Sequence, residues 1–92
     1  MESSSHAVSP ETVRLLVSQH IPDSQIFVRT YQGDDHFEVQ IISPSFVGKT
    51  LIAQHQMVYQ ALGEHMQQNI HALMLKTYTP ERWATLTVKE QE

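Results

Sequence analysis

The hydrophobic pattern of this 92-residue chain changes its period several times. Apolar residues recur at helical spacing over 10–20 and then alternate over 25–31 and 37–41. Helical spacing returns over 50–66, and residues 70–77 carry the alternating and consecutive apolar residues that are typical of a well-covered strand. A helix needs a period of about 3.6 and a half-buried strand a period of two. The pattern therefore predicts the order helix, strand, strand, helix, strand, within a chain that is long enough for one domain.

Both ends of this pattern carry helix-start signals. Ser9-Pro10 places an N-cap serine before a proline at the first helical position, and Thr79-Pro80 repeats the arrangement. The last helix is expected to be short and to end near Leu86. The chain is thus predicted to be an α+β protein of order α-β-β-α-β-α, with a three-stranded mixed sheet backed by helices. The expected organisation is a tail at 1–8, a single domain at 9–86 and a tail at 87–92.

Composition excludes several classes of protein. The formal charge is −4, from ten acids and six bases, which disfavours non-specific binding to nucleic acid. The chain has no cysteine, so a disulfide scaffold, a thiol nucleophile and a cysteine-only metal site are all excluded. No apolar run approaches the length of a membrane span, and the first residues do not form a signal peptide. We therefore expect a soluble cytoplasmic protein without a membrane partner.

Short motifs give little support to an enzymatic activity. Gly48-Lys49-Thr50 opens a helix, but the full phosphate-binding loop needs a glycine where this chain has Ser43. Asp34 and Asp35 lie in a turn-forming stretch and are interpreted as turn residues rather than catalytic carboxylates. No serine stands in a nucleophile elbow, and no H-E-x-x-H spacing occurs. We expect a protein that is not an enzyme and has no catalytic residue.

Histidine is the residue type on which a metal site would have to depend. His36 and His71 fall at the ends of predicted strands, where a rigid base can present a side chain outward. His55 lies on the apolar stripe of the predicted helix 50–66, together with Leu51 and Val58. Each can alternatively serve the fold itself, with its two ring nitrogens as donor and acceptor. The positions of the other histidines require no function: His6, His20 and His65.

Several segments of the chain share a pattern with a known family. They are Phe46–Leu51, Gln54–Tyr59, Ile70–Leu73 and Thr77–Trp83, together with the hairpin residues Asp35–Val39. On these residues the chain resembles the BolA family, and the similarity extends over nearly all of positions 9–83. The resemblance implies a BolA-like fold, which is related to the class II KH topology. The G-x-x-G loop with which KH domains bind nucleic acid is not matched.

The resemblance also implies partners and ligands. Members of the BolA family form heterodimers with monothiol glutaredoxins, bridged by a [2Fe–2S] cluster. The C-terminal cluster ligand of the family corresponds to His71, and the second ligand, from the region between the first two strands, corresponds to His36. The helix histidine of an R-H-R motif corresponds to His55, a weaker alternative ligand. Its flanking arginines are replaced by Gln54 and Gln56, which weakens any inherited DNA binding.

The chemistry of the chain agrees with a shared cluster. Iron–sulfur clusters normally take cysteine thiolates and accept histidine at one iron. A chain that offers two imidazoles as ligands and has no thiol would need a glutaredoxin cysteine and a glutathione thiolate for the remaining positions. The resulting heterodimer is predicted to act in cluster trafficking or in iron- or redox-dependent regulation.

Two other functions stay open at this point. Some family members regulate transcription in stress responses and cell shape, and a nucleic-acid-binding regulator would use Lys49, Lys76 and Arg82. A third reading is an interaction module that docks proteins without metal. The oligomeric state is also open, and a homodimer is possible.

Overall fold

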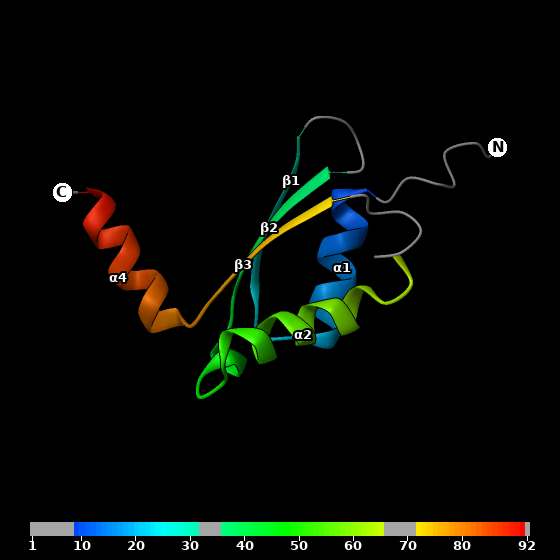
Figure 1. Cartoon of the computed structure of the whole chain (residues 1–92). Coiled ribbons are helices and arrows are strands. Elements are labelled where there is room, and N and C mark those ends of the chain that lie inside the picture. Colours follow the sequence, from blue (N-terminus) through cyan, green and yellow to red (C-terminus); the bar gives the residue numbers. More distant parts are fainter. Residues whose placement is uncertain (1–8, 32–35, 66–71, 92) are drawn as a thin grey trace.

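The computed structural model describes residues 9–31, 36–65 and 72–91 (Figure 1). The order of the elements is the predicted α-β-β-α-β-α. Their bounds are α1 Pro10–His20, β1 Gln25–Thr30, β2 His36–Ile42, the 3-10 turn η2 Pro44–Phe46, α2 Leu51–Leu62, β3 Ala72–Tyr78 and α4 Pro80–Gln91. The predicted caps are confirmed at the start of α1, where the hydroxyl of Ser9 accepts from the N–H of Thr12 at 3.1 Å.

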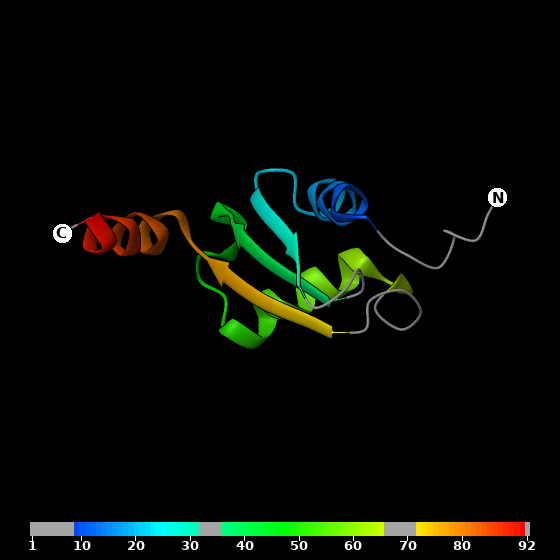
Figure 2. The ribbon, with the colours of Figure 1, turned by 90° about the horizontal axis from the view of Figure 1, so that it is seen from above.

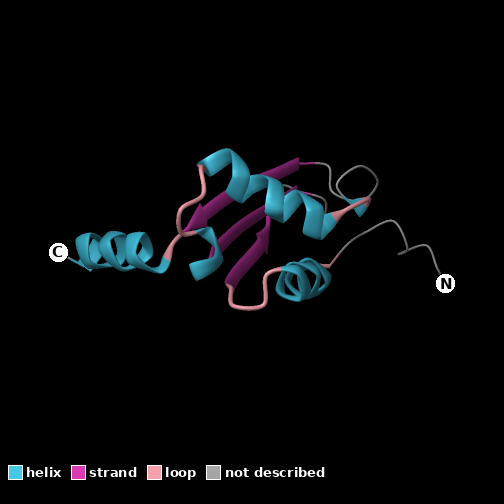
Figure 3. Cartoon of the chain, turned by 90° about the horizontal axis from the view of Figure 1, so that it is seen from below, coloured by secondary structure: helices cyan, strands magenta, loops and turns pink. Residues whose placement is uncertain are grey.

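The three strands form one mixed sheet in the order β1-β2-β3. β1 and β2 are antiparallel, with Phe27 opposite Gln40, and β2 and β3 are parallel, with His36 opposite Ala72. The parallel pair is joined by a crossover that contains α2, as a parallel connection requires. Figure 2 and Figure 3 show α1 and α2 on the same side of the sheet.

The core lies between the sheet and these two helices. Alternate residues of β2 point toward the helices and are completely buried: Phe37, Val39 and Ile41. They pack against Val13 and Val17 of α1 and against Val58 and Leu62 of α2. Burying a side chain of this kind is worth about 1.5–3 kcal/mol, so this layer holds α1 and α2 on the sheet.

Helix α2 differs from the predicted apolar stripe at its first turn. Val58 and Leu62 are buried as expected, but Leu51 is 61% exposed and the neighbouring Ile52 is 72% exposed. The helix ends at Leu62 because Gly63 follows with φ of 56°, and the predicted end at Met66 lies outside the described residues. The first turn of α2 lies beside the end of β3 rather than over the core, which leaves Leu51 on the surface.

Helix α4 is longer than the sequence predicted. It continues to Gln91 rather than ending near Leu86, because no glycine or proline interrupts residues 81–91. The ring of Trp83 stacks on Phe27 at 6.0 Å and lies 5.2 Å from Tyr78, which fixes the start of the helix to the sheet. The rest of α4 projects away from the body of the protein (Figure 1). Within the described part of the chain, no helix is both long and apolar enough to span a membrane.

Candidate functional site

His36 begins the central strand of the sheet. Its half-buried ring lies 5.7 Å from the ring of Tyr31 in an edge-on arrangement, and its carbonyl accepts from the N–H of Tyr31 at 2.9 Å. Across the parallel pair, His36 is the register partner of Ala72. His36 therefore lies between Tyr31, which follows β1, and Ala72 of β3, at the end of the sheet where β3 begins.

His71, the other predicted cluster ligand, lies outside the described residues. The described chain resumes at Ala72, the residue that follows it. The register partner of Ala72 is His36. Asp34 and Asp35, which were interpreted as turn residues, also lie outside the described residues.

His55 is placed elsewhere. It is half-buried in α2 and lines a groove of about 210 Å³ beside the far end of β3, where Leu75 and Tyr78 also line the wall. His36 of β2 lies beside Ala72, which is at the opposite end of β3. Since a strand rises about 3.3 Å per residue, the structure does not bring His55 to His36.

The ring of His55 has one unusual property. Its Nε2 atom is buried and has no hydrogen-bond partner among the described residues. A buried polar atom without a partner is uncommon in native proteins and requires an explanation. In the described part of the chain, no three side chains of histidine, cysteine, aspartate or glutamate gather as a metal site, so a metal centre on His55 lacks companions there.

The groove beside His55 also gathers two of the predicted nucleic-acid contacts. Lys76 of β3 and Arg82 of α4 line it, whereas Lys49, the third, is exposed and does not. No carboxylate is among its described lining residues. Two of the three predicted positions thus share one groove, and the third does not.

Gln54 has a structural role that the sequence did not reveal. Its side-chain oxygen accepts from the hydroxyl of buried Thr77 at 2.6 Å, and its amide nitrogen donates to the carbonyl of Lys49 at 3.0 Å. The side chain therefore ties α2 to β3 and to the turn before the helix. The only signal in the sequence was its replacement of an arginine in the R-H-R motif, which was interpreted as a loss of DNA contacts.

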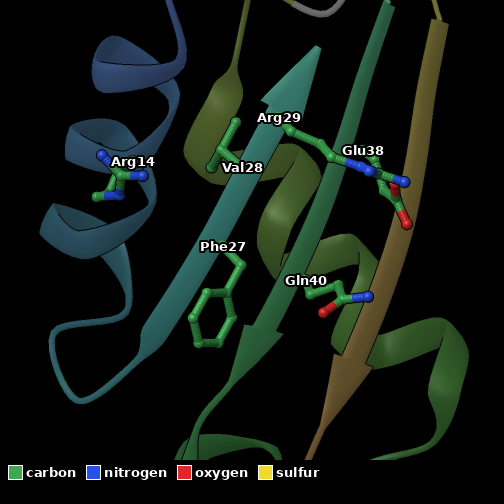
Figure 4. Close-up of a pocket in the computed structure, with 6 residues that line it drawn as sticks. All are labelled: Arg14, Phe27, Val28, Arg29, Glu38 and Gln40. Carbon is green, nitrogen blue, oxygen red and sulfur yellow. The ribbon is translucent and has the colours of Figure 1, made fainter. Parts of the chain in front are cut away.

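A second hollow, of about 390 Å³, lies along β1, where the sequence predicted no site (Figure 4). Arg29 and Glu38 are register partners on β1 and β2 and form an ion pair at 2.5 Å. Arg14 of α1 also lines the hollow and pairs with Glu11 at 3.1 Å. Both guanidinium groups in this hollow therefore already have a carboxylate partner, which leaves little charge for a ligand.

The fold defines a small α+β class in which a crossover helix joins the two parallel strands of a three-stranded mixed sheet. The family model described as "BolA-like protein" matches residues 1–82. The chain belongs to the BolA family.

Three relatives illustrate the similarity. The DNA-binding transcriptional regulator BolA of Escherichia coli is 38% identical over 54 residues, which are 59% of this chain and 51% of the relative. A bolA protein homologue from Coxiella burnetii is 40% identical with a TM-score of 0.67, covering 84% of this chain and 97% of that structure. Yeast Fra2 is 30% identical with a TM-score of 0.68, covering 92% and 94%. The chain matches only about half the length of the first curated relatives, between 50% and 57%.

Proposed function

We propose that this chain is a non-enzymatic cytoplasmic adaptor that binds a monothiol glutaredoxin and shares a [2Fe–2S] cluster with it. The chain contributes His71 and His36 as ligands. In this role it serves iron–sulfur cluster trafficking or iron- and redox-dependent regulation.

The register of the parallel strands carries the proposal. His36 is paired with Ala72, and His71 is the residue that precedes Ala72 in the chain. Paired strands lie about 4.8 Å apart and consecutive Cα atoms about 3.8 Å apart. This constraint supports a ligand pair on one end of the sheet and favours His36 over His55 as the second ligand.

The metal-ligating side chains of this sequence support a cluster that is shared with a partner rather than one held by this chain alone. Two imidazoles suffice for one iron, as in Rieske centres, and the second iron then needs thiolates that this cysteine-free chain does not have. The bound cluster would supply one-electron redox chemistry and a transferable iron–sulfur unit. The packing of His36 against Tyr31 would orient its imidazole before the partner arrives, which lowers the entropic cost of ligation.

The proposal is tested by mixing the chain with cluster-loaded monothiol glutaredoxin under anaerobic conditions. We expect a one-to-one complex that keeps its iron in native mass spectrometry and has a visible circular dichroism spectrum different from that of the glutaredoxin alone. A complex of equal affinity that forms without iron and leaves the spectrum unchanged would contradict the proposal. That outcome would favour a docking module without metal.

A second candidate function, a nucleic-acid-binding transcription regulator, is favoured by two observations. Lys76 and Arg82 line the same groove, and the E. coli relative is named a DNA-binding regulator. Anisotropy titrations with duplex DNA at several salt concentrations test it, because several phosphate contacts make affinity fall steeply with salt. Absence of binding at low salt would remove this candidate.

A further inference from the structure

The groove between α2, β3 and α4 is positive on an otherwise acidic molecule. The whole chain carries a formal charge of −4, yet Lys76 and Arg82 line this groove without any carboxylate among the described lining residues. Glu81, the acid adjacent to Arg82, is exposed on α4 and does not line the groove. The two permanent charges of the groove are therefore not neutralised within it.

The first turn of α2 adds to the positive electrostatic potential of the groove. Leu51 and His55 are one turn apart and both line the groove, so the positive end of the helix dipole lies at its wall. The imidazole of His55 forms part of the same wall, and its Nε2 atom is the buried nitrogen without a hydrogen-bond partner. A ligand that brings negative charge and hydrogen-bond acceptors would compensate the two cations and the positive end of the helix.

We propose that this groove binds the phosphate group of a small phosphorylated molecule. A phosphate monoester carries a charge of about −1.5 to −2 at neutral pH, so one group matches Lys76 and Arg82 together. The guanidinium of Arg82 can donate two parallel N–H bonds to phosphate oxygens, and the ammonium of Lys76 supplies a point charge. This use of the groove is independent of the proposed partnership with a glutaredoxin.

The distribution of the other cations favours a small ligand over a nucleic acid. A nucleic-acid backbone is followed by a stripe of bases, because its charges repeat along the strand. Lys49 does not line the groove, and Arg14 and Arg29 lie at the other hollow, paired with their own carboxylates. Lys76 and Arg82 are therefore the two bases that share one groove, of about 210 Å³, while Lys49 lies apart from it.

The test is an NMR titration of the ¹⁵N-labelled full chain, without metal, using inorganic phosphate, with sodium chloride of matched ionic strength as the reference. We expect saturable shifts in the amides of α2 near Leu51 and of β3 near Lys76. The variant Lys76→Gln/Arg82→Gln should bind phosphate at least about tenfold more weakly, because both charge-assisted contacts are lost. The matched control Arg14→Gln/Lys49→Gln removes the same charge outside the groove and should change the affinity less than about twofold.

Two results would overturn the inference. The first is a response to phosphate that does not saturate, matches that to chloride, or persists in Lys76→Gln/Arg82→Gln. The second is tight binding of a duplex oligonucleotide that inorganic phosphate does not displace and that Arg14→Gln/Lys49→Gln also weakens, which would assign the groove to a nucleic acid. The titration contains neither iron nor glutaredoxin. Neither result would therefore contradict the proposed cluster-adaptor function, which has a separate test.

Discussion

At the scale of single residues, polar contacts join α2 to β3. Thr77 is only 6% exposed, and its hydroxyl donates to the side-chain oxygen of Gln54 at 2.6 Å. The amide end of Gln54 is in turn held by the carbonyl of Lys49. Because this contact fixes the helix that carries the core residues Val58 and Leu62, it should contribute to stability.

The substitution Thr77→Val tests this contact. Valine keeps the shape of the side chain but removes the donor, leaving the oxygen of Gln54 without its partner inside the structure. We expect the free energy of unfolding, measured in urea, to fall by about 1–2 kcal/mol. Thr85→Val on the exposed face of α4 is the control and should change stability by less than about 0.5 kcal/mol. Equal effects in the two variants would show that the contact contributes nothing specific.

The buried nitrogen of His55 gives a second prediction at this scale. Replacing a buried polar group that has no partner by an apolar side chain of similar size removes a desolvation cost. His55→Leu should therefore leave stability unchanged or raise it by about 1 kcal/mol in urea unfolding, whereas His55→Ala should lower it by about 1–2 kcal/mol through lost packing. A loss of stability in His55→Leu as large as that in His55→Ala would mean that the nitrogen is in fact bonded.

At the scale of elements, the end of α2 depends on a glycine. Gly63 has φ of 56° and ψ of −132°, a combination outside the left-handed helical region that other residues sometimes adopt. We expect Gly63→Ala to lower the free energy of unfolding by about 1–3 kcal/mol, measured by thermal and urea unfolding. Gln60→Gly, at an exposed position about one turn earlier in the helix, is a control for helix propensity and should cost about 0.5–1 kcal/mol. A smaller loss in Gly63→Ala than in this control would contradict the assigned backbone geometry.

The attachment of α4 depends on Trp83. An isolated helix of this length is marginal in water, so its order must come from the aromatic contacts with Phe27 and Tyr78. Trp83→Ala should abolish amide-exchange protection in α4 and reduce the helical circular dichroism, while the β-sheet amides remain protected. Thr85→Ala, an exposed substitution in the same helix, should preserve both signals. Persistent protection of α4 in Trp83→Ala would show that other contacts hold it.

Most elements were predictable because their periods are local properties of the chain. The start of α1 and the strands β1 and β2 follow from capping and alternation, and these predictions are confirmed within a residue or two. The exposure of Leu51 was not predictable, because the apolar face of a helix does not indicate how far the neighbouring sheet extends beneath it. The end of α4 was placed too early because charged, polar residues were interpreted as a tail, although they are compatible with a helix.

The candidate sites were predictable only in part for a similar reason. The resemblance named His36, but the register that pairs it with Ala72 is a contact between distant parts of the chain. The separation of His55 from His36, and the groove that unites His55 with Lys76 and Arg82, likewise depend on tertiary packing. The residue types indicated which ligands each site could bind, whereas tertiary packing determines which of these residues lie close together.

At the scale of the whole molecule, the two proposed functions fall on separate regions. The end of the sheet that carries His36 is assigned to the shared cluster, and the positive groove at the far end of β3 is assigned to an anion. Loss of one function should therefore leave the other intact. This separation lets variants of His36 serve as matched controls for the groove and variants of Lys76 as controls for the cluster.

The most direct measurement is visible circular dichroism of the complex with cluster-loaded monothiol glutaredoxin, compared among His71→Ala, His36→Ala and His20→Ala. His20 is exposed at the end of α1, so its removal is the control for losing one imidazole. We expect His71→Ala and His36→Ala each to change the spectrum of the mixed complex and to speed the loss of its iron, whereas His20→Ala should do neither. If both ligand variants gave the spectrum and iron retention of the unmodified chain, the shared-cluster function would be contradicted.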